Sequence, residues 1–124
     1  MPARLPFTCR VPIYGGTLRL FTTRADFVTW CQSIGQPAAA ETPCAGRSFS
    51  TADKLGAITY TIAWLDGRLT TLSHETNHTA LRILKRAGMA PTDSDGEALC
   101  HLQAELMMLC GADEYDRPLT QLRA

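Results

Sequence analysis

Apolar and polar positions alternate most regularly along residues 57–65 of the chain. One set of alternate positions holds the large apolar and aromatic side chains of Ile58, Tyr60, Ile62 and Trp64. A period of two residues is typical of a β-strand, because successive side chains point to opposite faces. Asp66-Gly67 follows and predicts a hairpin turn, after which Arg68 to Thr71 is expected to pair back as a short strand.

Shorter β signals precede this strand. Apolar or β-prone residues between Phe7 and Thr22 flank Gly15-Gly16, a pair that permits a tight turn, so this segment predicts a hairpin of two short strands. The segment from Gln36 to Gly46 contains two prolines and no apolar period, which indicates a loop.

Three segments carry apolar residues at helical spacing. The first follows Thr23, a suitable N-cap with Asp26 three residues later, and ends at Gly35. The second covers about residues 72–87 and the third about residues 94–110, each followed by glycine. Together these patterns predict the α+β class, with a small, mostly antiparallel sheet of about three to four strands packed on three helices.

Composition limits the classes of function. The 124 residues are 45% hydrophobic, which suits a single domain over 1–124 that ends in a polar tail, 112–124. Lys and Arg total 12, as do Asp and Glu, and this zero net charge argues against nucleic acid as a partner. No apolar stretch reaches the roughly 18 residues of a membrane span, and the N-terminus does not resemble a secretion signal. The sequence specifies no oligomeric state.

The cysteines indicate a compartment. Their number, five, is odd, and none forms a CxxC pair, so we expect free thiols in a reducing environment and a cytoplasmic protein.

The strongest chemical signal is His74-Glu75-Thr76-Asn77-His78, an HExxH motif within the second predicted helix. Residues four apart project from one helix face, so both imidazoles can bind one zinc ion. Glu75 lies next to the first ligand and is predicted to act as general base and then general acid for a metal-activated water. The plainer interpretation is a polar helix face in which Glu75 pairs with a nearby arginine.

A catalytic zinc site generally needs a third protein ligand. The metzincin extension is excluded, since the required glycine and histidine are replaced by Leu81 and Leu84. Glu97, nineteen residues after His78 and in the first turn of the last predicted helix, is the better candidate. Its alternative role is in a capping box, because Ser94-Asp95-Gly96-Glu97 has the Ser-x-x-Glu pattern.

This spacing resembles that of the gluzincins, metallopeptidases in which a glutamate on a separate helix completes the zinc site. The likeness covers His74 to about Leu109, and the short chain is similar to the minimal minigluzincins and, less closely, to small zincin-like proteins carried by bacteriophages. The resemblance implies Zn²⁺ held by His74, His78 and Glu97. It also shows a departure, since His101 stands where larger gluzincins often have an aspartate that orients the first histidine.

The role of His101 is open: a rival third ligand, a donor to a developing oxyanion, or a polar helix residue. Cys44 upstream of the motif is a further candidate ligand, although its surroundings do not match the cysteine motif of peptide deformylases. Tyr60, Tyr115 and Arg117 are candidate oxyanion donors, with core or surface packing as the alternative.

Two functions follow. In the first, the chain is a zinc metallopeptidase whose substrate, a peptide or protein, adds as an extended strand to an exposed edge of the sheet at residues 57–65. In the second, the chain is a non-catalytic zincin-like module, encoded by a phage or another mobile element, that uses zinc structurally and binds another protein. The tail around Tyr115 to Arg117 is a candidate for covering the zinc and keeping an enzyme latent.

Overall fold

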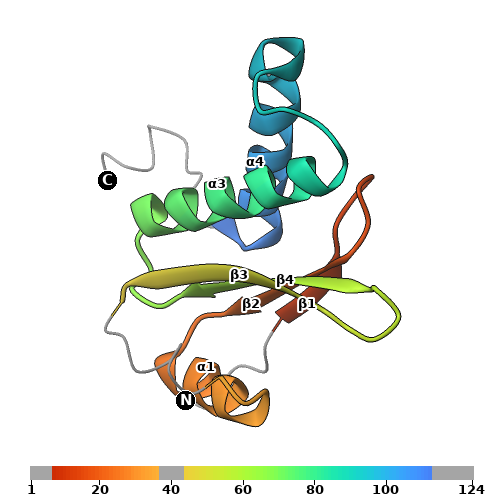
Figure 1. The fold of residues 1–124 in the computed structure, drawn as a ribbon. Coiled ribbons are helices and arrows are strands. Elements are labelled where there is room, and N and C mark those ends of the chain that lie inside the picture. Colours follow the sequence, from red (N-terminus) through yellow and green to blue (C-terminus); the bar gives the residue numbers. More distant parts are fainter. Residues whose placement is uncertain (1–6, 37–43, 113–124) are drawn as a thin grey trace, which may run out of the picture.

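A computed structural model describes residues 7–36 and 44–112 of the chain. Helix α1 covers one face of a four-stranded sheet, and helices α3 and α4 cover the other face (Figure 1). The elements are β1 (Phe7–Arg10), β2 (Thr17–Phe21), α1 (Arg24–Ser33), β3 (Gly46–Ala52), β4 (Ile58–Trp64), α3 (Leu69–Arg86), the 3₁₀ turn η1 (Asp93–Gly96) and α4 (Glu97–Leu109). The predicted α+β class is confirmed.

The strands lie in the order β1-β2-β4-β3. β1 and β2 are antiparallel, as are β3 and β4, whereas β2 and β4 pair in parallel at the centre. The sheet is therefore mixed, and the parallel pair arises because α1 carries the chain across one face between the two hairpins.

One strand was placed wrongly by the sequence pattern. The segment from Arg68 to Thr71 does not pair back along β4, because α3 already begins at Leu69. The Asp66 carboxylate accepts hydrogen bonds from Arg68 N at 3.0 Å and from Thr71 Oγ1 at 2.6 Å, which holds the first turn of the helix. The antiparallel partner of β4 is β3 instead, a strand whose alternation is weak because Phe49 is its only large apolar side chain.

β4 is buried on both faces, and its predicted alternation is confirmed. Tyr60, Ile62 and Trp64 enter a hydrophobic core shared with α3 and α4. Ala63 points to the opposite face, into a smaller core with Phe21 of β2 and Phe27 of α1. The sheet is thus the middle layer of three.

The predicted helices are present with shifted ends. Thr23 Oγ1 caps α1 by accepting from Asp26 N at 3.3 Å, as expected. α3 begins three residues earlier than predicted, and α4 begins at Glu97 after η1. Within residues 7–36 and 44–112, none of the helices combines the length and apolar character that a bilayer crossing requires.

Candidate metal centre

The HExxH residues lie in the first half of α3, where the helix packs over the sheet. The buried face of α3 includes Leu72, Ala80, Ile83 and Leu84, which pack into the hydrophobic core that α3 and α4 share with β4. Two buried threonines support it, since Thr76 Oγ1 donates to Leu72 O at 2.8 Å and Thr79 Oγ1 donates to Glu75 O at 2.9 Å. The motif therefore sits on a rigid helix rather than a loop.

His74 and His78 point outward from this helix as a pair. Their Nε2 atoms are 3.1 Å apart and their rings meet edge to face, with centroids 4.7 Å apart. Two zinc–nitrogen bonds of 2.0–2.1 Å at a tetrahedral angle would place the nitrogens about 3.3 Å apart. This spacing fits a shared ion and also fits a hydrogen bond between the two rings, and both rings are exposed to incoming metal.

Glu75 lies on the buried side of the same turn, with only 5% of its surface exposed. One carboxylate oxygen of Glu75 and one ring nitrogen from each histidine all lie within 4.8 Å of one another. The structure thus brings three of the predicted site residues, His74, Glu75 and His78, into one cluster.

Gly46 is a site residue that the sequence analysis missed. A Cβ atom at this position would lie 2.6 Å from Thr71 Cγ2 and 3.0 Å from Glu75 Cγ, so only glycine lets the start of β3 approach α3 this closely. The signal in the sequence was a glycine at the start of a strand that the pattern did not reveal.

An open pocket of about 370 Å³ borders the cluster. It is lined by His74 and Glu75 from the motif, by Thr70 and Thr71 one turn earlier, and by Ala45-Gly46 at the start of β3. Thr71, which lines the pocket, donates a hydrogen bond from its hydroxyl to the Asp66 carboxylate, so Asp66 holds this lining side chain in place. The hydrogen bonds from Thr71 and then from Arg68 N hold the pKa of Asp66 below its ordinary value.

Glu97 and His101 lie apart from this cluster. Glu97 Oε2 is 3.2 Å from His101 Nε2 on the surface of α4, with side chains 69% and 84% exposed respectively. Among the residues that the structure describes, neither joins His74, Glu75 and His78 in a metal-binding group. Zinc ligation by Glu97 and the catalytic role of His101 remain predictions.

The capping box proposed for Glu97 is wrong. Ser94 has φ 55° and ψ 41°, whereas an N-cap residue is usually extended, and Gly96 occupies the N-cap position of α4 without a side-chain hydrogen bond. The carboxylate is consequently not engaged at the helix end.

Gln103 on α4 forms hydrogen bonds with the motif helix, and the sequence analysis did not identify it. Its Oε1 accepts from Asn77 Nδ2 at 3.0 Å, and its Nε2 donates to Ser73 O at the same distance. The available signal was a glutamine between Leu102 and Leu106 of the apolar stripe, and the structure shows that it is half-buried there.

The remaining candidates lie elsewhere. Cys44 is half-buried and outside the histidine cluster, and its carbonyl oxygen accepts from Arg24 Nη2 at 2.7 Å. Tyr60 is in the core, where burial raises its pKa. Tyr115 and Arg117 lie outside the described residues.

No protein-family model, curated protein or solved structure matches the chain.

Proposed function

We propose that this protein is a zinc-dependent metallopeptidase whose centre is His74, Glu75 and His78. The observation that carries the proposal is the 3.1 Å separation of the two histidine Nε2 atoms beside a buried glutamate. Two imidazoles and a carboxylate suit zinc among the common divalent ions.

His74 and His78 would hold the ion, and their exposed rings leave room for further ligands. When bound, zinc supplies a Lewis acid that polarises the scissile carbonyl and makes water a stronger nucleophile. The exposed side of the pair adjoins the pocket lined by Thr70 and Thr71, which offers a place for the peptide bond.

Glu75 performs the proton transfer. Its carboxylate accepts a proton from the attacking water as the oxygen bonds to the carbonyl carbon. It then delivers that proton to the amide nitrogen as the C–N bond breaks, so that an acid and an amine leave. Its burial against Gly46 and Thr71 fixes the carboxylate beside the pocket and limits its rotamers.

The substrate in this proposal is an extended peptide alongside β3. The earlier placement along residues 57–65 is wrong, because β4 pairs on both sides, with β2 and with β3. β3 is an edge strand of the four-stranded sheet, and its first residue, Gly46, lines the pocket. A strand added there would enter the pocket beside Glu75.

The third ligand proposed is Glu97, in the manner of the gluzincins that the sequence resembles. To act so, it must exchange its contact with His101 for the ion. The position of Glu97 outside the cluster leaves the catalytic ligand set incomplete, which favours as second candidate function a non-catalytic module that retains zinc and binds another protein.

The test begins with the zinc content of the protein purified without added metal. We expect about one zinc per chain, lost in His74→Ala and in His78→Ala. Glu75→Gln should keep the zinc and lose hydrolysis of a mixed peptide library by at least about a hundredfold, as expected for loss of a general base. Glu105→Gln, the same change at an exposed position of α4, is the matched control.

The outcomes separate the candidates. Zinc with no hydrolysis in the parent protein favours the binding module, and absence of zinc contradicts both candidates. Glu97→Gln with unchanged zinc content would remove Glu97 from the ligand set, whereas a loss of zinc would support it.

A further inference from the structure

In the part of the chain that the structure describes, β3 offers an unpaired edge to an added strand. At one end of its antiparallel ladder with β4, Ala45 O accepts from Leu65 N at 2.9 Å. At the other end, Asp53 N donates to Ala57 O, also at 2.9 Å. Backbone groups alternate between the two sides of such a strand, so the odd-numbered residues of β3 bond to β4. The residues whose amide and carbonyl groups point to the outer edge are Gly46, Ser48, Ser50 and Ala52.

These same alternate residues of β3 turn their side chains toward α3. Ser48 pairs in register with Ile62, whose side chain lies in the core beneath α3. Arg82 Nη1 on α3 donates to Ser48 Oγ at 2.9 Å, in keeping with this direction. A strand added at the edge of β3 would alternate in the same way. Every second side chain of that strand would therefore lie on the face that carries Arg82.

Arg82 continues the row of the two histidines along α3. Four residues separate His74 from His78, and four more separate His78 from Arg82, each interval advancing the helix by about 6 Å. α3 and β3 run in the same direction, since the start of β3 lies against the first half of α3 and Ser48 lies against Arg82. A peptide along the outer edge of β3 would thus pass both the histidines and this guanidinium.

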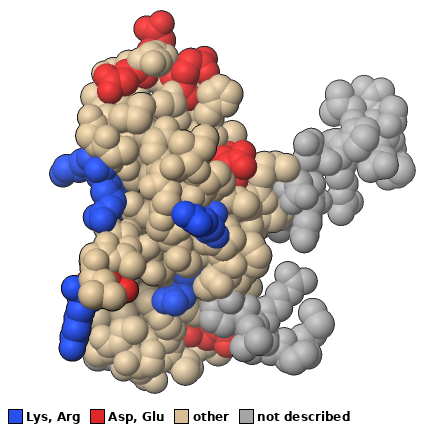
Figure 2. Space-filling view, turned by 90° about the vertical axis from the view of Figure 1, so that its right-hand side faces the viewer, with Lys and Arg blue, Asp and Glu red and all other residues tan. Residues whose placement is uncertain are grey.

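The charges of β3 and α3 are strongly uneven. Glu75 is the only acid in these two elements. Their cations are Arg47, Arg82, Lys85 and Arg86. Figure 2 views the side on which the β3–β4 hairpin lies and shows Lys and Arg side chains over its middle and lower parts, whereas most Asp and Glu side chains gather at the top, around η1 and the start of α4. Such separation of charge draws acidic rather than basic molecules to the region of β3.

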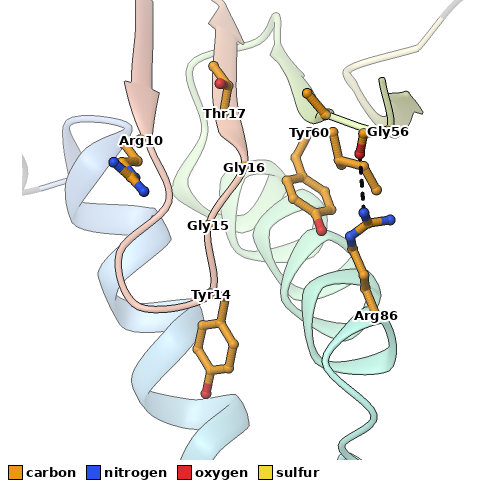
Figure 3. Close-up of a pocket in the computed structure, with 10 residues that line it drawn as sticks. Arg10, Tyr14, Gly15, Gly16, Thr17, Gly56, Tyr60 and Arg86 are labelled. Atoms are coloured by element: carbon orange, nitrogen blue, oxygen red, sulfur yellow. Dashed lines mark hydrogen bonds between the residues drawn. The ribbon is translucent and has the colours of Figure 1, made fainter. Parts of the chain in front are cut away.

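The guanidinium group of Arg82 is held in place by a neutral partner. Ser48 accepts one hydrogen bond, and a guanidinium has five N–H donors. Arg86, one turn further along α3, donates in the same manner to the carbonyl of Gly56 at 3.3 Å, as Figure 3 shows. Within residues 7–36 and 44–112 the single ion-pair contact lies elsewhere, on α4. Both arginines thus keep donors for a carboxylate.

We propose that the peptide bound along β3 is acidic, with an Asp or Glu side chain paired to the guanidinium of Arg82. The inference rests on the proposed function, because it names the substrate class of the same site. A guanidinium fork matches the paired oxygens of a carboxylate. Ser48 lies two residues, or about 7 Å, from Gly46 in the pocket beside the motif. The acidic residue is accordingly expected about two residues from the cleaved bond.

The test measures peptide binding apart from hydrolysis. The full chain carrying Glu75→Gln is titrated, at fixed ionic strength, into fluorescently labelled peptide libraries of about ten residues, and anisotropy reports binding. The libraries differ at one fixed central position, which is glutamate, glutamine or lysine. We expect the glutamate library to bind about tenfold more tightly than the glutamine library, the effect of one charged hydrogen-bonded pair, and the lysine library to bind least.

Variants of Arg82 make the test specific. Arg82→Gln should remove the preference for glutamate, Arg82→Lys should retain part of it, and Arg82→Glu should transfer the preference to lysine. Arg10→Gln is the matched control, because it removes the same charge from an exposed position of β1, at the opposite edge of the sheet. It should leave each affinity within about twofold. Circular dichroism and thermal melting check that each variant is folded.

The outcomes separate this inference from the proposed function. Equal affinity for the three libraries, or equal losses in Arg82→Gln and Arg10→Gln, would overturn the acidic preference. Hydrolysis of all three libraries by the parent protein at equal rates would also overturn it, while keeping the peptidase. Binding of the glutamate library that depends on Arg82, without hydrolysis by the parent protein, would reject the peptidase and support the acidic peptide as the bound partner.

Discussion

Asn77 on α3 donates a hydrogen bond to Gln103 on α4, with Nδ2 and Oε1 3.0 Å apart. The other end of the Gln103 amide donates to the backbone oxygen of Ser73, also at 3.0 Å. Ser73 and Asn77 directly precede the two histidines of the motif, so α4 is fastened to the turn that presents them. Glu97 lies six residues before Gln103, about 9 Å further along the helix axis.

Gln103→Leu is expected to lower the free energy of unfolding by about 1–3 kcal/mol, because Asn77 loses its partner in a half-buried contact. Urea denaturation measures the change. Gln32→Leu, at an exposed position of α1, is the matched control and should stay within about 0.5 kcal/mol. In a double-mutant cycle, adding Asn77→Ala should cost less than it does alone. Strict additivity would contradict the coupling.

Gly46→Ala is expected to destabilise the fold by about 1–3 kcal/mol, since the new methyl group overlaps Thr71 Cγ2 and crowds Glu75. Thermal melting and urea denaturation measure the loss. The Thr71→Ser change removes the methyl that would lie 2.6 Å away and keeps the hydroxyl that binds Asp66. The double variant should therefore recover part of the stability. No recovery would mean that the clash is with the backbone oxygen of Ala63 instead.

Asp66 is expected to contribute to acid sensitivity. Its folded-state pKa is lowered, first by the hydrogen bond from Thr71 and then by that from Arg68 N. The unfolded chain therefore takes up the proton at higher pH, near the ordinary value of about 3.9. The contribution is present above that pH and is lost as the pH falls through the lower folded-state value.

Melting temperatures between pH 2 and pH 6 check this expectation. Asp66→Asn should melt at a lower temperature at pH 6 and show a shallower fall below pH 4 than the parent. Thr71→Val, which removes the larger cause of the shift, should reproduce part of that change. A slope unchanged in both variants would contradict the role of the carboxylate at the start of α3.

The cysteines are expected to react with iodoacetamide in an order set by burial. Cys110 is buried, and desolvation raises its pKa to about 12, whereas Cys100 is exposed on α4. At pH 8 Cys100 should be alkylated first, and Cys110 only after unfolding in urea, because the thiolate is the reacting form. Mass spectrometry of the digested protein measures both.

The same shift has a consequence at high pH. A thiol whose folded-state pKa lies above the ordinary 9.0 stabilises the fold below pH 9, and this contribution is lost as the pH rises toward 12.

The Cys100→Ser variant serves as the control for the alkylation, since it removes the fastest site. Alkylation of Cys110 in the folded variant at the rate seen for Cys100 would contradict its burial.

Local patterns in the sequence determined much of the fold. Thr23 and the apolar spacing after it predicted α1, and the alternation along residues 57–65 predicted β4. These signals succeed because helix caps and side-chain periodicity depend on neighbours along the chain. The pairing of His74 with His78 belongs to the same class, because four residues along a helix bring two side chains to one face.

Tertiary contacts decided the rest. The sequence could not show that β2 and β4 pair in parallel, or that β3 rather than residues 68–71 lies beside β4, because pairing depends on packing of both faces of the sheet. Nor could the spacing of nineteen residues show which residue of α4 faces the motif. The crossing of α3 and α4 placed Gln103 there and left Glu97 outside the histidine cluster, since the direction of a helix is set by the core that it covers.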